Sequence, residues 1–361
     1  MSQNRLWILI ALALAVGAGA LWLSRHQSSP RESEYGTPVF PALGAELDKV
    51  DSLRVIGAGD KLLVTLKRNG AGWLVADPGY PADSTRVRRL LVALADLKIV
   101  EPKTQDPARY AALGVEDVAD PKAQSVRLEL GGLAEPLALL VGHAAAGQDG
   151  YLRVVGHAQA LEARPGLDVA RSPRDWLARS IVDIGAARVH SVTVERTDAP
   201  PWRAVKAKRD APHFEVPGLP KGKELASLGA ADVAGNALSN VELDAVRKVQ
   251  PSSTRPQRVI VECFDGLVVT VEGRSEGDAR WVTVAARYDA ALAARYPAPP
   301  APPAPPAPGA GASGAPPGAA APVNAEAEAT RLAAQTAGWE YQVPAYRFDA
   351  LFRKRDELLR H

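Results

Sequence analysis

Between Lys61 and Lys98 the spacing of apolar residues changes from a period of two to a period near 3.6. Residues 61–67 alternate between apolar and polar side chains, which is the pattern of a half-buried β-strand. Leu62, Val64 and Leu66 fall on the same face of this strand. We therefore expect a strand that places these three side chains in a core.

A turn and a helix follow this strand. Asn69-Gly70 is typical of a type I′ turn, because both of its central residues need positive φ, and residues 73–75 supply a returning strand. Asp83 or Ser84 can then cap an amphipathic helix. The stretch predicts a hairpin whose apolar face is covered by that helix. The apolar side of the helix comprises Val87, Leu90, Leu91, Leu94 and Leu97, and the polar side comprises Arg86, Arg88, Arg89 and Asp96.

A weaker copy of this stretch lies between Trp202 and Lys248, and other segments match in the same order. Several matches in a conserved order indicate an internal duplication. We expect an α+β fold of two fused repeats, residues 50–184 and 185–361, each a mainly antiparallel sheet with packed helices. Strands of the first repeat are predicted at 53–56, 126–130, 137–141, 151–155 and 160–164. The matched segments are 53–55 with 192–194, 67–73 with 208–214, 124–129 with 257–262, and 174–177 with 355–358.

An apolar segment near the N-terminus predicts a transmembrane helix. Residues 6–23 comprise 18 uncharged residues, and at ~1.5 Å per residue a helix of this length spans about 27 Å, close to the ~30 Å hydrocarbon core of a bilayer. The alternative is a signal peptide cleaved after Ala18-Gly19-Ala20, but apolar residues continue through Leu23, which favours an uncleaved anchor at 1–24. Residues 25–49 are polar and broken by proline and glycine, which is typical of a stalk. We expect the body to lie outside the cytoplasm.

Residues 297–322 form a tract that holds eleven of the thirty prolines. Such a tract usually links two domains as extended polyproline II. The duplication instead places it inside the second repeat, between a strand at 281–284 and a strand near 338–344. We therefore predict a long insertion between two strands of one sheet.

The composition excludes several classes of function. The chain has 43 basic and 41 acidic residues, a formal charge of +2, so it lacks the clustered basic excess that nucleic-acid binding requires. Its single cysteine, Cys263, excludes an intrachain disulfide and a multi-cysteine zinc site. We interpret Cys263 as a small buried hydrophobic residue.

Residues that carry catalysis or bind metals are sparse. The six histidines include no H-E-x-x-H motif. His143 and His157 flank a turn and are the best available pair for a weak metal site, although exposed loop histidines are the favoured interpretation. We expect no metal, no cofactor and no enzymatic activity.

Acidic and aromatic residues leave two alternatives open. Glu116 with Asp117, or Asp175 with Asp183, can be posed as a general acid and base, against a simpler role as helix caps and surface charge. Exposed tryptophans can stack on sugars, but strand and helix positions favour the core instead. The tryptophans in question are Trp73, Trp176, Trp202, Trp281 and Trp339.

Two basic clusters occur in the chain. Arg86, Arg88 and Arg89 lie on the polar side of the helix predicted after Asp83, and Arg353-Lys354-Arg355 lies near the C-terminus. A solvated helix face is the simplest interpretation. Because the copy of the opening stretch lacks the first cluster, Arg86, Arg88 and Arg89 are our candidate contact for a protein partner or for anionic lipid, at about 1 kcal/mol per charge.

Several motifs together resemble the bacterial family known as domain of unknown function 4340. They are the apolar N-terminal segment, the strand-turn-Trp-helix run 62–97, Tyr110-Ala111-Ala112-Leu113-Gly114, Gly142 with Tyr151-Leu152-Arg153-Val154, and Arg174-Asp175-Trp176-Leu177 before Val189-His190-Ser191-Val192. The resemblance covers most of residues 50–361. It implies no known activity, and it implies a setting beside ABC-type export or gliding-motility components.

These observations predict a single-pass protein of the inner (cytoplasmic) membrane with its body on the periplasmic side. We expect a non-enzymatic accessory or scaffold role, docking on an ABC-type transporter or another envelope complex. A module that binds cell-envelope glycan is the alternative, and a carboxylate-dependent hydrolase is the third possibility.

Overall fold

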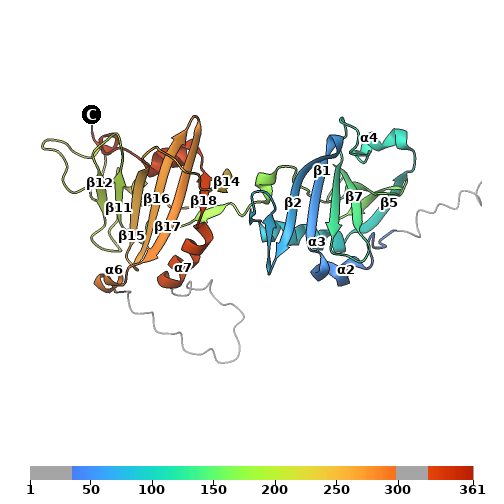
Figure 1. Ribbon diagram of the computed structural model, residues 1–361, viewed down its shortest axis with the longest axis horizontal. Coiled ribbons are helices and arrows are strands. Elements are labelled where there is room, and N and C mark those ends of the chain that lie inside the picture. Colours follow the sequence, from blue (N-terminus) through green and yellow to red (C-terminus); the bar gives the residue numbers. More distant parts are fainter. Residues whose placement is uncertain (1–34, 298–323, 361) are drawn as a thin grey trace, which may run out of the picture. The chain divides into compact units, whose positions relative to one another are not determined.

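The structure, a computed structural model, describes residues 35–297 and 324–360. It divides into two compact units, unit 1 ending at Leu177 and unit 2 beginning at Ala178 (Figure 1). Each unit is α+β, with antiparallel strand pairing and few helices, as the sequence predicts. The predicted anchor at 1–24 and nearly all of the proline-rich tract lie outside the described residues. Within the described ranges, no helix has both the length and the apolar character needed to cross a membrane.

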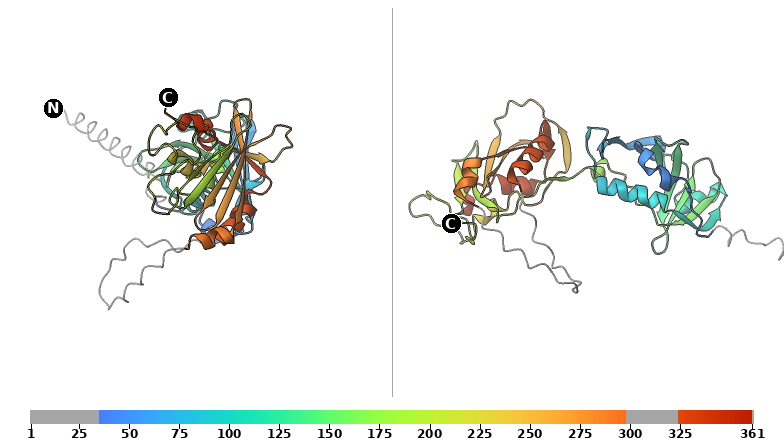
Figure 2. Two further views of the ribbon diagram at one scale, coloured as in Figure 1. Left: turned by 90° about the vertical axis from the view of Figure 1, so that its left-hand side faces the viewer. Right: turned by 90° about the horizontal axis from the view of Figure 1, so that it is seen from below.

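Unit 1 contains one sheet, whose strands follow the order β4-β3-β2-β1-β6-β7-β8-β9-β5. The strands predicted from alternation correspond to β1, β2, β3, β6, β7, β8 and β9. Helix α3 lies against this sheet (Figure 2). The elements are α2 (Leu43–Glu46), η1 (Leu47–Lys49), β1 (Ser52–Gly57), η2 (Ala58–Asp60), β2 (Lys61–Asn69), β3 (Gly72–Val75), β4 (Tyr80–Pro81), α3 (Ser84–Ala95), β5 (Lys98–Thr104), η3 (Pro107–Arg109), α4 (Tyr110–Leu113), β6 (Val126–Gly131), β7 (Leu137–Ala144), β8 (Gly150–Val154), β9 (Ala160–Arg164) and η4 (Pro173–Trp176).

The opening hairpin differs from the prediction in two details. Asn69 pairs with Gly72, so the turn residues are Gly70 and Ala71, and among the turn residues only Gly70 has positive φ. This is the type II′ pattern, and the predicted type I′ turn is wrong. A register shift between Val55 and Ile56 of β1 also interrupts the alternation of β2, which leaves Leu62 50% exposed.

Helix α3 forms as its sequence predicts. The Asp83 carboxylate accepts hydrogen bonds from the backbone N–H of Thr85 (2.9 Å) and of Arg86 (3.1 Å), which makes Asp83 the N-cap. The apolar side is buried, and Leu97 is buried just beyond the helix. The buried helical residues are Val87, Leu90, Leu91 and Leu94.

Residues 35–49 belong to the range that the sequence assigns to a stalk. In the structure, Gly36 and Val39 donate backbone hydrogen bonds to Ile99 and Leu97 (2.8 Å each), and Ile99 donates one to Thr37 (2.9 Å). This segment therefore extends the sheet at β5. The chain joins unit 1 through a strand-like contact from residue 36 onward.

Unit 2 contains a sheet in the order β12-β11-β15-β16-β17-β18-β14 and a small β10-β13 pair. The expected copy of the opening stretch is reduced to β12, an isolated bridge between Val205 and Glu215, and a helix of four residues, α5. The elements are β10 (Ser180–Val182), β11 (Val189–Glu195), β12 (Trp202–Val205), α5 (Asp232–Gly235), β13 (Val241–Glu242), β14 (Ala245–Lys248), β15 (Gln257–Cys263), β16 (Leu267–Glu276), β17 (Ala279–Tyr288), α6 (Ala290–Arg295), α7 (Ala325–Thr336), β18 (Trp339–Gln342), α8 (Ala345–Leu351) and η5 (Arg355–Leu358).

Six strands of the two sheets follow the same order of neighbours. The order β1-β6-β7-β8-β9-β5 of unit 1 corresponds to β11-β15-β16-β17-β18-β14 of unit 2. Matching Leu53 with Val192, as the sequence suggests, and following the paired residues across each sheet assigns the equivalent positions. The equivalent residues are Leu53 and Val192, Leu130 and Val261, Val126 and Gln257, Val141 and Gly273, Leu152 and Val282, and Leu161 and Tyr341.

Two segment matches made from the sequence are displaced. The match of 67–73 with 208–214 aligns Lys67 with Lys208, whereas the strand register aligns Lys67 with Val205. The match of 124–129 with 257–262 aligns Val126 with Val259, whereas the strand register aligns Val126 with Gln257. A shift of two residues keeps the same side chains on the buried face, because side chains alternate with a period of two. Alternation alone could not distinguish the two alignments.

Candidate functional site

Helix α3 carries the three arginines that the sequence selects, and the structure separates them. Arg86 is 30% exposed at its side chain, and its Nη1 lies 3.2 Å from Oδ2 of Asp168. Arg86 is thus engaged by a residue of its own unit.

Arg88 and Arg89 are exposed on the outer face of α3. Within residues 35–297 and 324–360, neither guanidinium forms a hydrogen bond or an ion pair. Val92, one turn further along the helix, is 44% exposed. Two unpaired cations beside an exposed apolar side chain are the features of a contact surface, and we call these three residues the α3 face.

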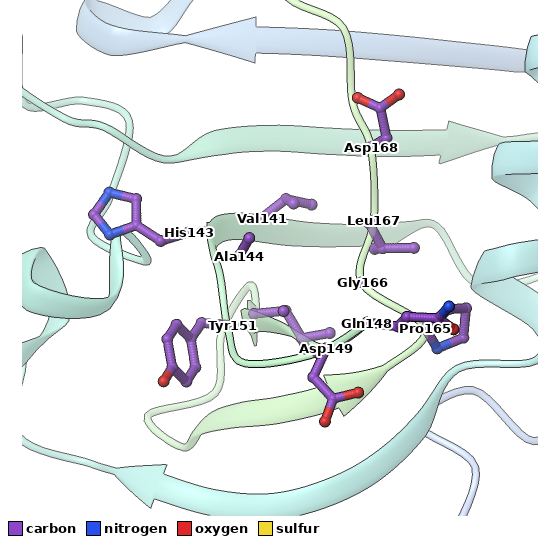
Figure 3. A pocket seen from close by; sticks show the side chains of 14 residues that line it. Val141, His143, Ala144, Gln148, Asp149, Tyr151, Pro165, Gly166, Leu167 and Asp168 are labelled. Carbon is purple, nitrogen blue, oxygen red and sulfur yellow. The ribbon is translucent and has the colours of Figure 1, made fainter.

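A cavity of 520 Å³ lies near Asp168, the partner of Arg86. Figure 3 shows the carboxylates of Asp149 and Asp168 on its opposite sides, pointing apart. Arg164 donates two hydrogen bonds to Asp149, at 2.5 and 2.9 Å, and holds the pKa of that carboxyl below its usual value. Nε2 of His143 lies 2.9 Å from Oε1 of Gln124. Since each of these groups already has a partner, the cavity offers no ready general acid or base.

The structure does not bring together the proposed histidine pair. The backbone N–H of Val155 bonds to Ala138, near the start of β7, whereas His143 lies at the end of β7. His157 therefore lies at the opposite end of the β7-β8 hairpin from His143. Among the described residues, no group of three or more His, Cys, Asp and Glu side chains could hold a metal ion.

In the second proposed acid pair, Asp183 has a hydrogen-bond partner and Asp175 lies at a helix start. Oδ1 of Asp183 accepts the backbone N–H of Asn240 at 2.8 Å. Asp175 and Asp356 each lie in the first turn of a 3₁₀ helix, η4 and η5, which are the closing helices of the two units. These contacts agree with the simpler interpretation as capping and surface charges.

All five tryptophans of the described ranges are buried, at 8% exposure or less. The Arg247 guanidinium carbon lies 3.6 Å from the centroid of Trp281, and Lys248 Nζ lies 3.4 Å from that of Trp339. These rings therefore pack the core and do not form an exposed stacking surface. Cys263 is also fully buried, which raises the pKa of its thiol to about 12 and leaves it unreactive.

The second basic cluster is paired. Lys354 Nζ lies 2.9 Å from Oδ2 of Asp198, and Arg353 Nε lies 3.9 Å from a carboxylate oxygen of Glu357. This cluster therefore offers fewer free charges than the α3 face.

A histidine–aspartate pair, His213 with Asp232, was not identified from the sequence. Nδ1 of His213 lies 2.7 Å from Oδ2 of Asp232, whose Oδ1 accepts the backbone N–H of Phe214 at 2.9 Å. His213 lines a cavity of 670 Å³. The pair is separated by nineteen residues of mostly irregular chain and matches no motif, so the sequence holds no signal for it. In the described chain no serine, threonine or cysteine is hydrogen-bonded to His213.

Comparison with known proteins identifies one family. The family model described as Domain of unknown function (DUF4340) matches residues 73–258, from β3 of unit 1 to the start of β15 of unit 2. No curated protein and no solved structure matches the chain.

Proposed function

The chain belongs to the DUF4340 family, and we propose that it is a membrane-anchored accessory or scaffold protein of the cell envelope. In this proposal residues 6–23 cross the inner membrane and the two units lie on the periplasmic side. The partner is an integral membrane component, and an ABC-type transporter fits the setting that the family resemblance implies. The protein carries out no catalysis in this role.

The observation that carries the proposal is the α3 face. Unpaired arginines on a rigid, capped helix attract an acidic surface without first breaking an intramolecular ion pair. The exposed Val92 adds apolar area beside them. Stacking of sugars on exposed tryptophans has no support, because the five tryptophans of the described ranges are buried, and this favours docking.

The path of the chain supports a location near the membrane. Gly36 pairs with Ile99, four residues after the end of α3 at Ala95. The eleven residues 24–34 that separate Leu23 from the described chain span at most about 40 Å when extended. An anchor at 6–23 would therefore keep unit 1 close to the bilayer.

The shared strand order supports a further part of the proposal, that the two units arose by duplication. Six strands agree in order over five consecutive antiparallel pairings, which independent folds would rarely reproduce. The α3 face has no counterpart in unit 2, where the equivalent helix α5 has four residues. We therefore assign framework to the shared strands and partner contact to α3.

Site-specific photocrosslinking in native membranes tests the proposal. A photoreactive amino acid replacing Val92 of the full-length protein should form an adduct with a membrane protein. The adduct should be lost when Arg88 and Arg89 are both changed to glutamate, which reverses the charge of the surface. Leu62, 50% exposed on β2 of the same unit, is the matched control position and should form no such adduct. Absence of an adduct at position 92, or equal adducts at both positions, would contradict docking through α3.

A further inference from the structure

A second cavity of unit 1, of 550 Å³, lies between Arg153 of β8 and the segment that connects β5 with β6. It differs from the cavity near Asp168 because two of its charged groups have atoms without a hydrogen-bond partner. The polar residues that line it are Tyr110, Glu116, Asp117, Asp120, Arg153 and His157.

Arg153 is 6% exposed and is fixed on three sides. Its Nε donates to the carbonyl oxygen of Val115 at 3.0 Å, and its Nη1 donates to that of His157 at 3.2 Å. Its guanidinium carbon lies 4.4 Å from the centroid of Tyr110. The Tyr110 hydroxyl in turn donates to the carbonyl oxygen of Ala158. The guanidinium is thus held rigidly against the cavity.

The remaining nitrogen of Arg153, Nη2, is buried and has no hydrogen-bond partner. Its nearest carboxylate is that of Asp117, at 3.4 Å, and the Asp117 side chain is 72% exposed. A solvated carboxylate at this distance can rotate into water at small cost. Nη2 is therefore a donor that a ligand carboxylate can occupy with better geometry.

Glu116 presents the opposite arrangement. Its Oε1 accepts the backbone N–H of Gln124, whereas its Oε2 is buried and has no partner. Buried carboxylate oxygens are normally hydrogen-bonded, so Oε2 is an unsatisfied acceptor in a residue that lines the cavity. The cavity therefore combines an unmatched donor with an unmatched acceptor.

The framework shared by the two units does not require this cavity. The register places Thr283 of unit 2 at the position of Arg153. The β5-β6 connection spans residues 105–125, whereas the equivalent β14-β15 connection spans only 249–256. The residues that form the cavity are thus additions specific to unit 1.

We propose that this cavity binds a small α-amino acid that carries a second cationic group. Three lining carboxylates outnumber the single guanidinium, so a simple anion is repelled and a ligand with net positive charge is favoured. The ligand carboxylate bonds to Nη2 of Arg153 and displaces Asp117. The ligand ammonium groups bond to Oε2 of Glu116 and to Asp120.

Calorimetric titration of the full-length protein in detergent tests the ligand class. L-lysine should bind, whereas 1,5-diaminopentane lacks the carboxylate that Arg153 recognises, and L-glutamate lacks the second ammonium group. The diamine and L-glutamate should each bind at least about tenfold more weakly than L-lysine, because each loses one charge-assisted hydrogen bond. No binding of lysine at millimolar concentration, or equal binding of lysine and the diamine, would overturn the proposal.

A variant isolates the acceptor. Glu116→Gln keeps an oxygen for the Gln124 N–H and removes the charge, so lysine affinity should fall about tenfold while thermal stability is retained. Glu272→Gln is the matched control, because Glu272 of unit 2 occupies the position equivalent to Leu140, beside Arg153, and should leave lysine binding unchanged. If Glu116→Gln folds normally and binds lysine with unchanged affinity, the assignment is wrong. An Asp120→Asn variant with a smaller loss supports the same placement of the ammonium groups, and an unchanged affinity there removes Asp120 from it.

Discussion

Units 1 and 2 each contain a sheet, and six strands of the two sheets follow the same order, but the long connections between strands lie at different places. Unit 1 has its long connection between β5 and β6, whereas unit 2 has its long connection, residues 289–338, between β17 and β18. The equivalent β8-β9 connection of unit 1 comprises residues 155–159. The α3 face lies in a part that unit 2 lacks, and the Arg153 cavity is completed by another, the long β5-β6 connection, although Arg153 itself lies on the shared strand β8. The shared strands therefore form the common framework, and the segments that differ between the units are the best candidates for functional sites.

The shared positions also differ in how their cores are filled. Val141 of unit 1 corresponds to Gly273 of unit 2, where the rings of Phe348 and Phe352 occupy the space of a side chain. Ala160 corresponds to Glu340, since Leu161 and Tyr341 are equivalent neighbours. Exchanging residues between the units therefore tests the equivalence directly.

The largest effect is expected for Gly273→Val, which installs the residue of unit 1 in unit 2. A Cβ at this position would overlap ring atoms of Phe352 and Phe348, so the change should destabilise unit 2 by about 3 kcal/mol. The loss of stability is measured by denaturant unfolding, with chemical modification of the buried Cys263 thiol as the signal. Val141→Ala, which shortens the residue of unit 1, is the control and should leave Cys263 protection unchanged. A wild-type unfolding midpoint for Gly273→Val would contradict the close packing of Phe348 and Phe352 against Gly273, which distinguishes the two cores.

A somewhat smaller effect is expected for Glu340→Gln. Glu340 is 1% exposed, and its carboxylate lies 2.9 Å from Arg247 Nε and 2.7 Å from an Nη of Arg274. Removing its charge leaves two largely buried guanidinium groups with Glu276 alone, at a cost of about 2 kcal/mol. Glu276→Gln, at 43% side-chain exposure, should cost less than about 1 kcal/mol. Thermal unfolding of the two variants side by side measures the difference, and equal losses would show that burial does not matter here.

An effect of about 1 kcal/mol is expected for Asp83→Ala, which removes the N-cap of α3. The neighbouring Ser84→Ala change should be nearly neutral, because Ser84 is the first helical residue and Asp83 makes the cap. Hydrogen exchange of the α3 amides reports the loss locally. Unit 2 amides should not respond, because Asp83 and α3 lie in unit 1.

The smallest effect is expected for deletion of residues 297–322. Shortening the β17-β18 connection from 50 to 24 residues should change the free energy of unfolding by only about 0.6 kcal/mol, because loop-closure entropy depends on the logarithm of length. Helix α7 remains held, since Arg188 pairs with both Asp265 and Glu328 at 2.8 Å. Calorimetry of the deletion variant measures this. A loss of several kcal/mol would mean that the tract supports the fold.

Much of the fold was predictable because its signals are local. The spacing of Val87, Leu90 and Leu94 and the cap at Asp83 specify α3 without reference to the rest of the chain. The strands of unit 1 likewise show their alternation directly. In contrast, the displaced turn and the bulge in β2 depend on pairing with β1 and β3, which alternation does not encode.

The candidate sites were less predictable. The α3 arginines were visible, but only the structure shows that Arg86 is paired with Asp168, which lies 82 residues away. Arg153 and Glu116 come from a strand and a loop 37 positions apart, and burial leaves them with unmatched atoms. No spacing rule records such an arrangement, because it arises from how the loop packs over the sheet.

The backbone pairing of residues 36–39 with β5 has a mechanical consequence. Any tension applied to the chain before Tyr35 reaches unit 1 first at three backbone hydrogen bonds along the edge of its sheet. The link from unit 1 into unit 2 is built in the same way, because Ile184 donates to Leu238 and Leu243 donates to Arg179. In each unit, a pulling force on the preceding chain therefore acts first on a short hydrogen-bonded segment. The hydrogen bonds of that segment must break before the force acts on the core.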